Sequence, residues 1–327
     1  MILSFDDIRS ILHGAVRCCE KDGILYAYRF TEEQMAAYEK YNDDFFLKAA
    51  ATAGIKLDFY TNSQTLRIKG QVFRASSRAF FGFDFSVDGA LVCHKHGYFG
   101  EDITYDFEVK LGEGEKKKVT VYFPWSAQAT ISSFELDDGA YFENVVRPYK
   151  MICFGDSITQ GYMAQNPSFT YATRFSELLL ADSVNKGIGG EVFFPTLASL
   201  KDDIEPDIIT VAYGTNDWSH VEKQAFEEKS KLFFEALSAN YPNSKIFALA
   251  PIWRGNYNAK KTPIGDFSNV AKHFAKVVSD LPNVTLIDCF DFILHDADFY
   301  VEDILHPNDA GFAHYAAELY NAIKKQI

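Results

Sequence analysis

Four short motifs hold the residues with which this chain can do chemistry. One motif, Gly-Asp-Ser, lies at 155–157, a glycine-rich stretch lies at 187–190, and polar stretches lie at 214–217 and 303–306. Together they supply a serine hydroxyl, an imidazole, carboxyl groups and a side-chain amide. A hydroxyl nucleophile, a base and a group that orients the base are what ester cleavage requires. The motifs therefore predict acyl-transfer chemistry.

The residue types assign a role to each candidate. Ser157 stands where a strand is expected to turn sharply, so it is the candidate nucleophile. His306 is the candidate base, and Asp303 can reach the other nitrogen of its ring from three residues earlier. The backbone N–H groups of Ser157 and Gly190 and the side-chain amide of Asn216 can form an oxyanion hole.

Each motif has a plainer interpretation when it is taken alone. The sequence Gly-Asp-Ser is common in strand-to-helix turns, and residues 214–217 can be a capped helix start. Residues 303–306 can be a capped turn before the last helix. All four motifs nevertheless occur at predicted strand ends, and this arrangement favours the catalytic interpretation of the set.

Three further residues are candidates for substrate binding. Trp218 follows the third motif, and Trp253 and Arg254 follow a predicted strand, where they can line a pocket or simply pack. His94 and His96 are two residues apart, but no third ligand stands near them, so no metal site is expected. The proposed chemistry needs no cofactor.

The second half of the chain alternates strands with helices. Strands are expected at 150–154, 184–185, 207–213, 245–250 and 284–288, and helices at 171–181, 221–240, 265–281 and 309–325. This alternation predicts a parallel sheet with helices on both faces. Active sites in such sheets lie at the carboxyl ends of the strands, which is where the motifs fall.

The first half has another pattern. Short runs of alternating apolar and polar residues occupy 45–146, and turn signals such as Asp88-Gly89 separate them. They predict a β-rich, jelly-roll-like sandwich. Short helices are expected at 4–20 and 31–41. Pro148 marks a linker, so we expect an accessory domain at 1–147 and a catalytic domain at 148–327.

The composition narrows the classes of partner. The 327 residues carry a net charge of −13, which argues against nucleic acid or an anionic membrane surface as the main partner. No stretch approaches the roughly 18 apolar residues of a membrane span. The acidic N-terminus lacks a signal-peptide pattern, and five scattered cysteines favour a reduced, cytoplasmic chain. The sequence leaves homo-oligomerisation open.

The four motifs resemble blocks of the SGNH (GDSL-type) hydrolases, in that family's order. The matching stretches are Gly155–Thr159 for the first block, Asn185–Gly190 for the second, Gly214–Asp217 for the third and Asp303–His306 for the fifth. Ile158 stands where the name-giving pattern has Leu. The resemblance covers residues 150–327 and implies a flavodoxin-like, three-layer α/β/α fold. A β-rich domain ahead of it is similar in architecture to the second carbohydrate esterase family.

These observations lead to one expectation and two alternatives. We expect a serine esterase that hydrolyses small acyl esters, with acetyl the first choice, of a carbohydrate or other small molecule through an acyl-enzyme intermediate. A lipase or thioesterase acting on longer acyl chains is the alternative among enzymes. A carbohydrate-binding protein with a vestigial hydrolase site is the alternative from another class.

Overall fold

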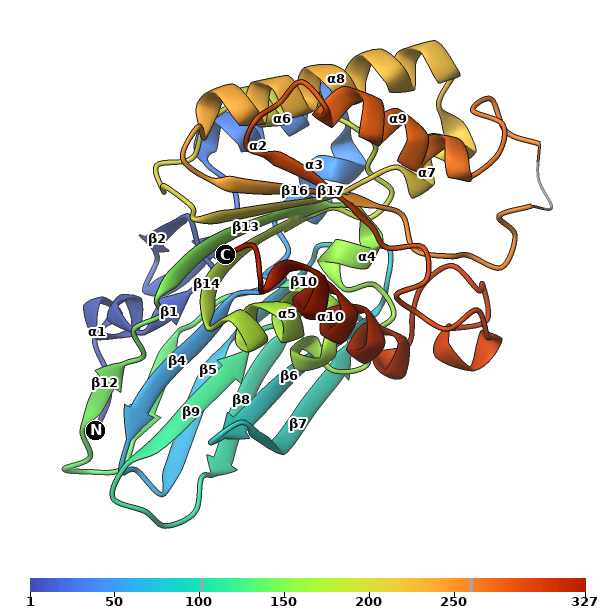
Figure 1. Ribbon diagram of the computed structural model, residues 1–327. Coiled ribbons are helices and arrows are strands. Elements are labelled where there is room, and N and C mark those ends of the chain that lie inside the picture. The colour runs from blue at the N-terminus through green and yellow to red at the C-terminus, as the bar shows by residue number, and fades with distance from the viewer. Residues whose placement is uncertain (101–102, 259–260) are drawn as a thin grey trace.

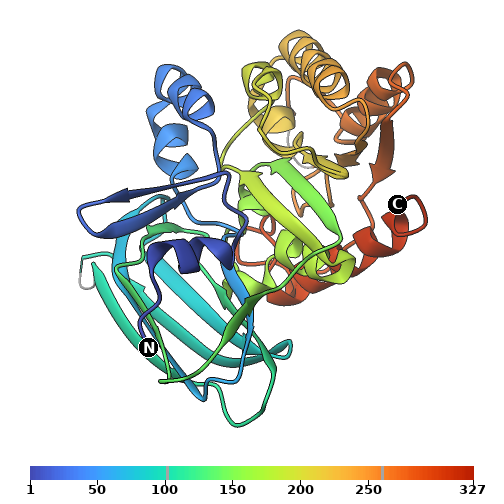
Figure 2. The same ribbon diagram turned by 90° about the vertical axis from the view of Figure 1, so that its left-hand side faces the viewer.

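A computed structural model describes residues 1–100, 103–258 and 261–327. They form a β-sandwich and a three-layer α/β/α unit that lie against each other (Figure 1 and Figure 2). Within this part of the chain, no helix is both long and apolar enough to span a membrane.

The α/β/α unit is built on a parallel sheet. Its strands are β13 (Tyr149–Gly155), β14 (Ala181–Gly187), β15 (Ile208–Ala212), β16 (Lys245–Ala250) and β17 (Val284–Asp288). They lie in the order β14-β13-β15-β16-β17, and every neighbouring pair is parallel. This is the flavodoxin-like order, so the expected fold class is confirmed. The order reverses between β13 and β15, where the loops after these strands part.

Helices cover both faces of this sheet, and this explains the apolar runs of its three central strands, β13, β15 and β16. One face carries α5 (Tyr171–Leu179) and α10 (Asp309–Ile323), whose Phe175 and Phe312 share a buried cluster with Met151. The other face carries α6 (Pro195–Ser199), α8 (Lys223–Asn240) and α9 (Ser268–Val278). There Phe233 and Phe274 pack in one cluster with Ile152.

The β-sandwich has the two antiparallel sheets that the alternating pattern predicted. One sheet contains β1 (Leu12–His13), β4 (Lys56–Thr61), β6 (Phe80–Val87), β7 (Ala90–Tyr98), β9 (Lys117–Tyr122) and β12 (Phe142–Asn144). The other contains β5 (Thr65–Arg74), β8 (Thr104–Lys110), β10 (Ala127–Ala129) and β11 (Ser133–Leu136). Phe59, Phe83 and Phe134 lie in the core between them. The expected Asp88-Gly89 turn joins β6 to β7.

The single helix expected over residues 4–20 is wrong beyond its first turns. The helix α1 (Phe5–Ser10) ends early, and β2 (Arg17–Lys21) pairs with β3 (Ile24–Tyr28) as a hairpin. Asp22 and Gly23 have φ values of 53° and 72°, which a two-residue type I′ turn requires. The Asp-Gly pair was therefore a turn signal that outweighed the loose helical periodicity.

Two N-terminal helices leave the sandwich and join the α/β/α unit. The helix α2 (Glu32–Tyr41) confirms the expected helix at 31–41, and α3 (Asp43–Ala49) follows it directly. Both lie in the same layer as α6 and α8 (Figure 1). Met35 and Tyr38 belong to the buried cluster that contains Phe193 and Phe194. The division into domains at residue 147 stays a prediction. Residues 30–49 lie before that boundary but pack against the α/β/α unit, which follows it.

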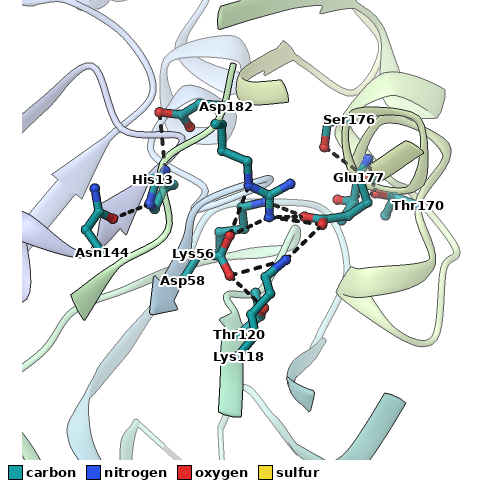
Figure 3. Close-up of polar contacts among 12 residues, drawn as sticks. His13, Lys56, Asp58, Lys118, Thr120, Asn144, Thr170, Ser176, Glu177 and Asp182 are labelled. Atoms are coloured by element: carbon teal, nitrogen blue, oxygen red, sulfur yellow. Dashed lines mark hydrogen bonds and ion pairs between the residues drawn. The ribbon is translucent and has the colours of Figure 1, made fainter. Parts of the chain in front are cut away.

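A network of charged side chains joins the sandwich to α5. Glu177 on α5 accepts hydrogen bonds from Arg147 (2.9 Å and 3.0 Å) and pairs with Lys118 and Lys56. Asp58 on β4, which has no exposed surface, also pairs with Arg147. Figure 3 shows the side chains of Asp58 and Lys118, from the sandwich, pointing toward Glu177 on α5. The network fixes how the sandwich sits beside the parallel sheet.

Candidate active site

Ser157 begins the short helix α4 (Ser157–Gln160), directly after β13. Asp156 caps this helix by accepting a hydrogen bond from the N–H of Ile158 (3.0 Å). A Cβ on Gly155 would lie 2.1 Å from Oγ1 of Thr159, so only glycine fits at this turn. The chain therefore bends sharply and holds the Ser157 hydroxyl at the carboxyl edge of the sheet.

Ser157, His306 and Asp303 form one hydrogen-bonded chain. The distance between Ser157 Oγ and His306 Nε2 is 2.8 Å, and that between His306 Nδ1 and Asp303 Oδ2 is 2.6 Å. A carboxylate at Nδ1 favours the tautomer that carries its proton there. His306 Nε2 is then the acceptor for the Ser157 hydroxyl. The three predicted residues are brought together although 149 positions separate Ser157 from His306.

The Asp303 carboxylate is stabilised in its charged form. Burial raises the pKa of Asp303, but a hydrogen bond from the His306 ring and others from the N–H groups of His306 and Leu305 outweigh it. They lower the pKa of Asp303 to about 2. Asp303 is thus ionised at neutral pH and can stabilise an imidazolium at His306.

Gly190, in the loop after β14, and Asn216, in the helix after β15, follow the two strands that flank β13, at the same carboxyl edge of the sheet as Ser157. Asn216, in the short helix α7 (Thr215–His220) after β15, donates from Nδ2 to the carbonyl oxygen of Glu191 (3.0 Å). Gly190 has a φ of 87°, in the left-handed region that favours glycine. Within the described ranges, neither the Ser157 N–H nor the Gly190 N–H donates a hydrogen bond to another residue. Both N–H groups are therefore available to a developing oxyanion.

Three buried acids surround these loops, and each has a raised pKa because burial disfavours its charge. The pKa of Asp156 is raised to about 6, that of Asp217 to about 7 and that of Glu191 to about 8. Tyr38 and Tyr213 donate hydrogen bonds to the two oxygens of Glu191 (2.5 Å and 2.7 Å). With a pKa of about 8, Glu191 is mostly neutral at pH 7, so it adds little negative charge next to Gly190.

Tyr162 connects the site to the sandwich. Its ring lies nearly parallel to the His306 ring, with the centroids 6.1 Å apart, and it also packs on Trp125 at 5.0 Å. Beyond it lies a cavity of about 480 Å³. The cavity is lined by Arg78, Phe80, His94, His96, Tyr98, Trp125 and residues 163–166, together with Val301. The sandwich therefore contributes an aromatic wall close to the hydrogen-bonded chain.

The structure separates the three residues expected to bind substrate. Trp218 has no exposed surface and donates a hydrogen bond to the carbonyl of Gly265 (2.7 Å), which corrects our expectation of a substrate contact. Its size and burial make it a core residue. Arg254 is also buried, where it lies over Trp218 and donates hydrogen bonds to Thr215.

Trp253 is the one of these three that remains half-buried. It stacks on His295 at 5.1 Å and packs on Tyr300, so its position is fixed by neighbouring rings.

Sequence reasoning missed Lys48, Tyr38 and Glu191. Lys48 donates a hydrogen bond to the carbonyl of Gly189 (2.8 Å), and Tyr38 holds Glu191. These pairs are 141 and 153 positions apart along the chain, so no local pattern could reveal them. The glycines of the second motif were the only nearby signal.

The α/β/α fold and the order of the motifs at its carboxyl edge are those of an SGNH hydrolase. Residues 153–314 match the model of the GDSL-like lipase/acylhydrolase family, and the chain belongs to that family through them. A search of the curated proteins found no significant match.

Solved structures with a similar fold extend over the whole chain. The salicylyl-acyltransferase SsfX3 from a tetracycline biosynthetic pathway has a TM-score of 0.87 at 20% identity, covering 100% of this chain and 97% of its own. A structure described as a GDSL-like lipase, from Bacteroides ovatus, has a TM-score of 0.77 at 20% identity, and the match covers 97% of this chain and 96% of that one. A family two carbohydrate esterase from Clostridium thermocellum, in complex with cellohexaose, has 0.67 at 18% identity, with 93% and 98% covered. At these identities the likeness shows the fold, including the combination of sandwich and sheet.

Proposed function

We propose that this protein is a serine esterase that removes a small acyl group, acetyl in the first place, from a carbohydrate alcohol. The observation that carries the proposal is the hydrogen-bonded chain from Ser157 through His306 to Asp303. The same three residue types perform acyl transfer on unrelated folds when they have this geometry.

The reaction follows from the positions of these groups. Ser157 Oγ attacks the ester carbonyl carbon while its proton passes to Nε2 of His306, and the carbonyl oxygen becomes an oxyanion. The N–H groups of Ser157 and Gly190 and the Asn216 amide donate to that oxyanion. The C–O bond to the alcohol then breaks, and His306 returns the proton to the leaving alcohol. Water, deprotonated by His306, attacks the acyl-enzyme and releases the carboxylic acid and free Ser157.

The cavity beside Tyr162 supports a sugar-like alcohol. Its wall of Phe80, His96 and Tyr98 offers ring faces on which a pyranose can stack. His94 donates from Nδ1 to the buried Asp84 carboxylate (2.7 Å), so its Nε2 is an acceptor for a hydroxyl. The carbohydrate complex of the Clostridium thermocellum enzyme agrees in substrate class with this proposal.

The experiment that tests the function compares wild type with Ser157→Ala. We expect wild type to hydrolyse 4-nitrophenyl acetate and to release acetate from acetylated oligosaccharides, and Ser157→Ala to do neither while it keeps its thermal unfolding midpoint. Tyr98→Ala, changed at a half-exposed ring (51%) in the cavity wall, should raise KM for the oligosaccharide alone. Full activity of Ser157→Ala would refute the proposal. A preference for octanoate esters over acetate esters would favour the alternative of a lipase or thioesterase that acts on longer acyl chains.

Acyl transfer to another alcohol is a second candidate, favoured by one observation. The salicylyl-acyltransferase matches the full length of this chain at a TM-score of 0.87. An acyl-enzyme at Ser157 can react with an alcohol instead of water, with the same base and oxyanion hole. Formation of a new ester in preference to free acid, when acceptor alcohols are added, would establish transfer as the main reaction.

A further inference from the structure

The loop that carries the Gly190 N–H is held from one side by the N-terminal segment 29–48. Three side chains of this segment bind four alternate residues, two at the end of β14 and two in the loop that follows it. Arg29, which is fully buried, donates to the carbonyls of Asn185 (2.5 Å) and Gly187 (3.0 Å). Further along, Lys48 donates to the carbonyl of Gly189, and Tyr38 to the side chain of Glu191.

The contact from Lys48 is the most informative, because of the peptide to which it is made. The carbonyl of Gly189 and the N–H of Gly190 belong to the same peptide unit. A trans peptide is planar, so its C=O and its N–H point in opposite directions. An ammonium group fixed on the Gly189 oxygen therefore fixes the direction in which the Gly190 N–H points.

Lys48 also brings charge to this peptide. Its side chain is 9% exposed and is held by Asp44 one turn earlier on α3. A Cβ built on Gly190 would lie 3.9 Å from Nζ of Lys48 and 3.8 Å from Phe45, so α3 packs directly on the oxyanion loop. A hydrogen bond to a charged donor polarises a peptide and strengthens donation from its other end.

We propose that Lys48 is a positioning residue of the oxyanion hole, and that Tyr38 supports it by holding Glu191. This rests on the proposed esterase function. Neither residue touches the ester: Lys48 acts through the peptide between Gly189 and Gly190, and Tyr38 acts through the loop that follows. The N-terminal helices are on this account part of the catalytic apparatus of the α/β/α unit.

The test removes these donors while it keeps the size of each side chain. For Lys48→Met we expect kcat on 4-nitrophenyl acetate to fall ten- to a hundredfold, with KM within about twofold, because loss of a whole oxyanion donor costs about 10²–10³ in kcat. Tyr38→Phe should lower kcat about three- to tenfold in the same way. Lys48→Arg, which keeps a cationic donor, should recover part of the loss.

Two matched controls separate positioning from stability. Lys56 is a buried lysine (3% exposed) that pairs with Glu177 on α5 and not with the loop, so Lys56→Met should lower the unfolding midpoint and leave kcat unchanged. Tyr41 lies on the same helix as Tyr38 with its ring stacked on Phe194, and Tyr41→Phe should have wild-type kcat. If Lys48→Met does not fold, Tyr38→Phe and Lys48→Arg carry the test.

A second readout makes the outcome independent of ester turnover. An alkyl fluorophosphonate labels an activated serine, and its phosphoryl oxygen occupies the oxyanion hole as the bond forms. We expect labelling of Ser157, followed by mass spectrometry, to slow in Lys48→Met and Tyr38→Phe in parallel with kcat. If the fluorophosphonate labels the wild-type protein but the protein hydrolyses no ester, the esterase function alone is refuted. If the folded variants Lys48→Met and Tyr38→Phe are labelled at the wild-type rate and have the wild-type kcat, the proposed role of Lys48 and Tyr38 is overturned.

Discussion

Arg147 tests how the sandwich is joined to α5. We expect Arg147→Met to destabilise the protein strongly. Its side chain is 2% exposed and binds Asp58, which has no exposed surface, and Glu177 on α5. Methionine keeps most of the stem of the side chain but removes the charge. The Asp58 carboxylate then stays buried without its main counter-ion.

The size of the effect follows from what remains around Asp58. Breaking a buried ion pair by removing one partner costs about 3–5 kcal/mol. Asp58 retains a hydrogen bond from Thr120 (2.8 Å) and an ion pair with Lys118 at 3.6 Å. Because these contacts remain, we expect Arg147→Met to lower the free energy of unfolding by about 3 kcal/mol, the lower end of that range. Figure 3 shows both of them beside Asp58.

The assay is urea unfolding followed by tryptophan fluorescence, with two comparison variants. Arg67 forms a two-point pair with Asp106 in which the side chains are 42% and 46% exposed, so Arg67→Met should lower the free energy of unfolding far less than Arg147→Met does. Adding Asp58→Asn to Arg147→Met should recover part of the loss, because the unpaired charge is gone. Equal losses for Arg147→Met and Arg67→Met would refute the reasoning.

Two further predictions concern the site. Asp303→Asn should lower kcat on 4-nitrophenyl acetate by about 10⁴-fold with little change in fold, because an amide favours the wrong tautomer of His306; a loss below tenfold would contradict this. Burial raises the pKa of Glu191 from 4.5 to about 8, so its contribution to stability is full below pH 4.5 and is lost as the pH rises to about 8. Glu191→Gln should flatten that decline when the unfolding midpoint is measured against pH, and an unchanged pH profile of the midpoint would contradict this prediction.

The central strands of the parallel sheet and the candidate catalytic residues could be predicted from the sequence for a physical reason. A strand buried on both faces must be apolar throughout, so the run at 207–213 was recognisable as β15 without its neighbours. Gly155, the last residue of β13, is required by a local close contact with Thr159 four residues away. Such constraints act over a few residues, and a sequence records them directly.

The parts that could not be predicted depend on distant partners. Lys48 reads as a surface lysine near a helix end, yet its side chain is buried because Asp44 and Gly189 share its charge. Trp218 reads as a pocket residue because it follows Asp217, yet α7 turns it into the core. In both cases the tertiary contact, and not the local pattern, decides exposure.

The oxyanion loop shows why the catalytic unit extends beyond the residues that match the family. The match begins at residue 153, whereas Arg29, Tyr38 and Lys48 lie more than a hundred positions before it. A loop rich in glycine has the widest choice of backbone angles, so little within it fixes its peptide planes. Donors placed on its carbonyls restrict that choice, and a cation among them also draws electrons away from the N–H that faces the substrate. A chain reduced to the matching residues would keep Ser157 and His306 and lose the groups that aim the Gly190 N–H.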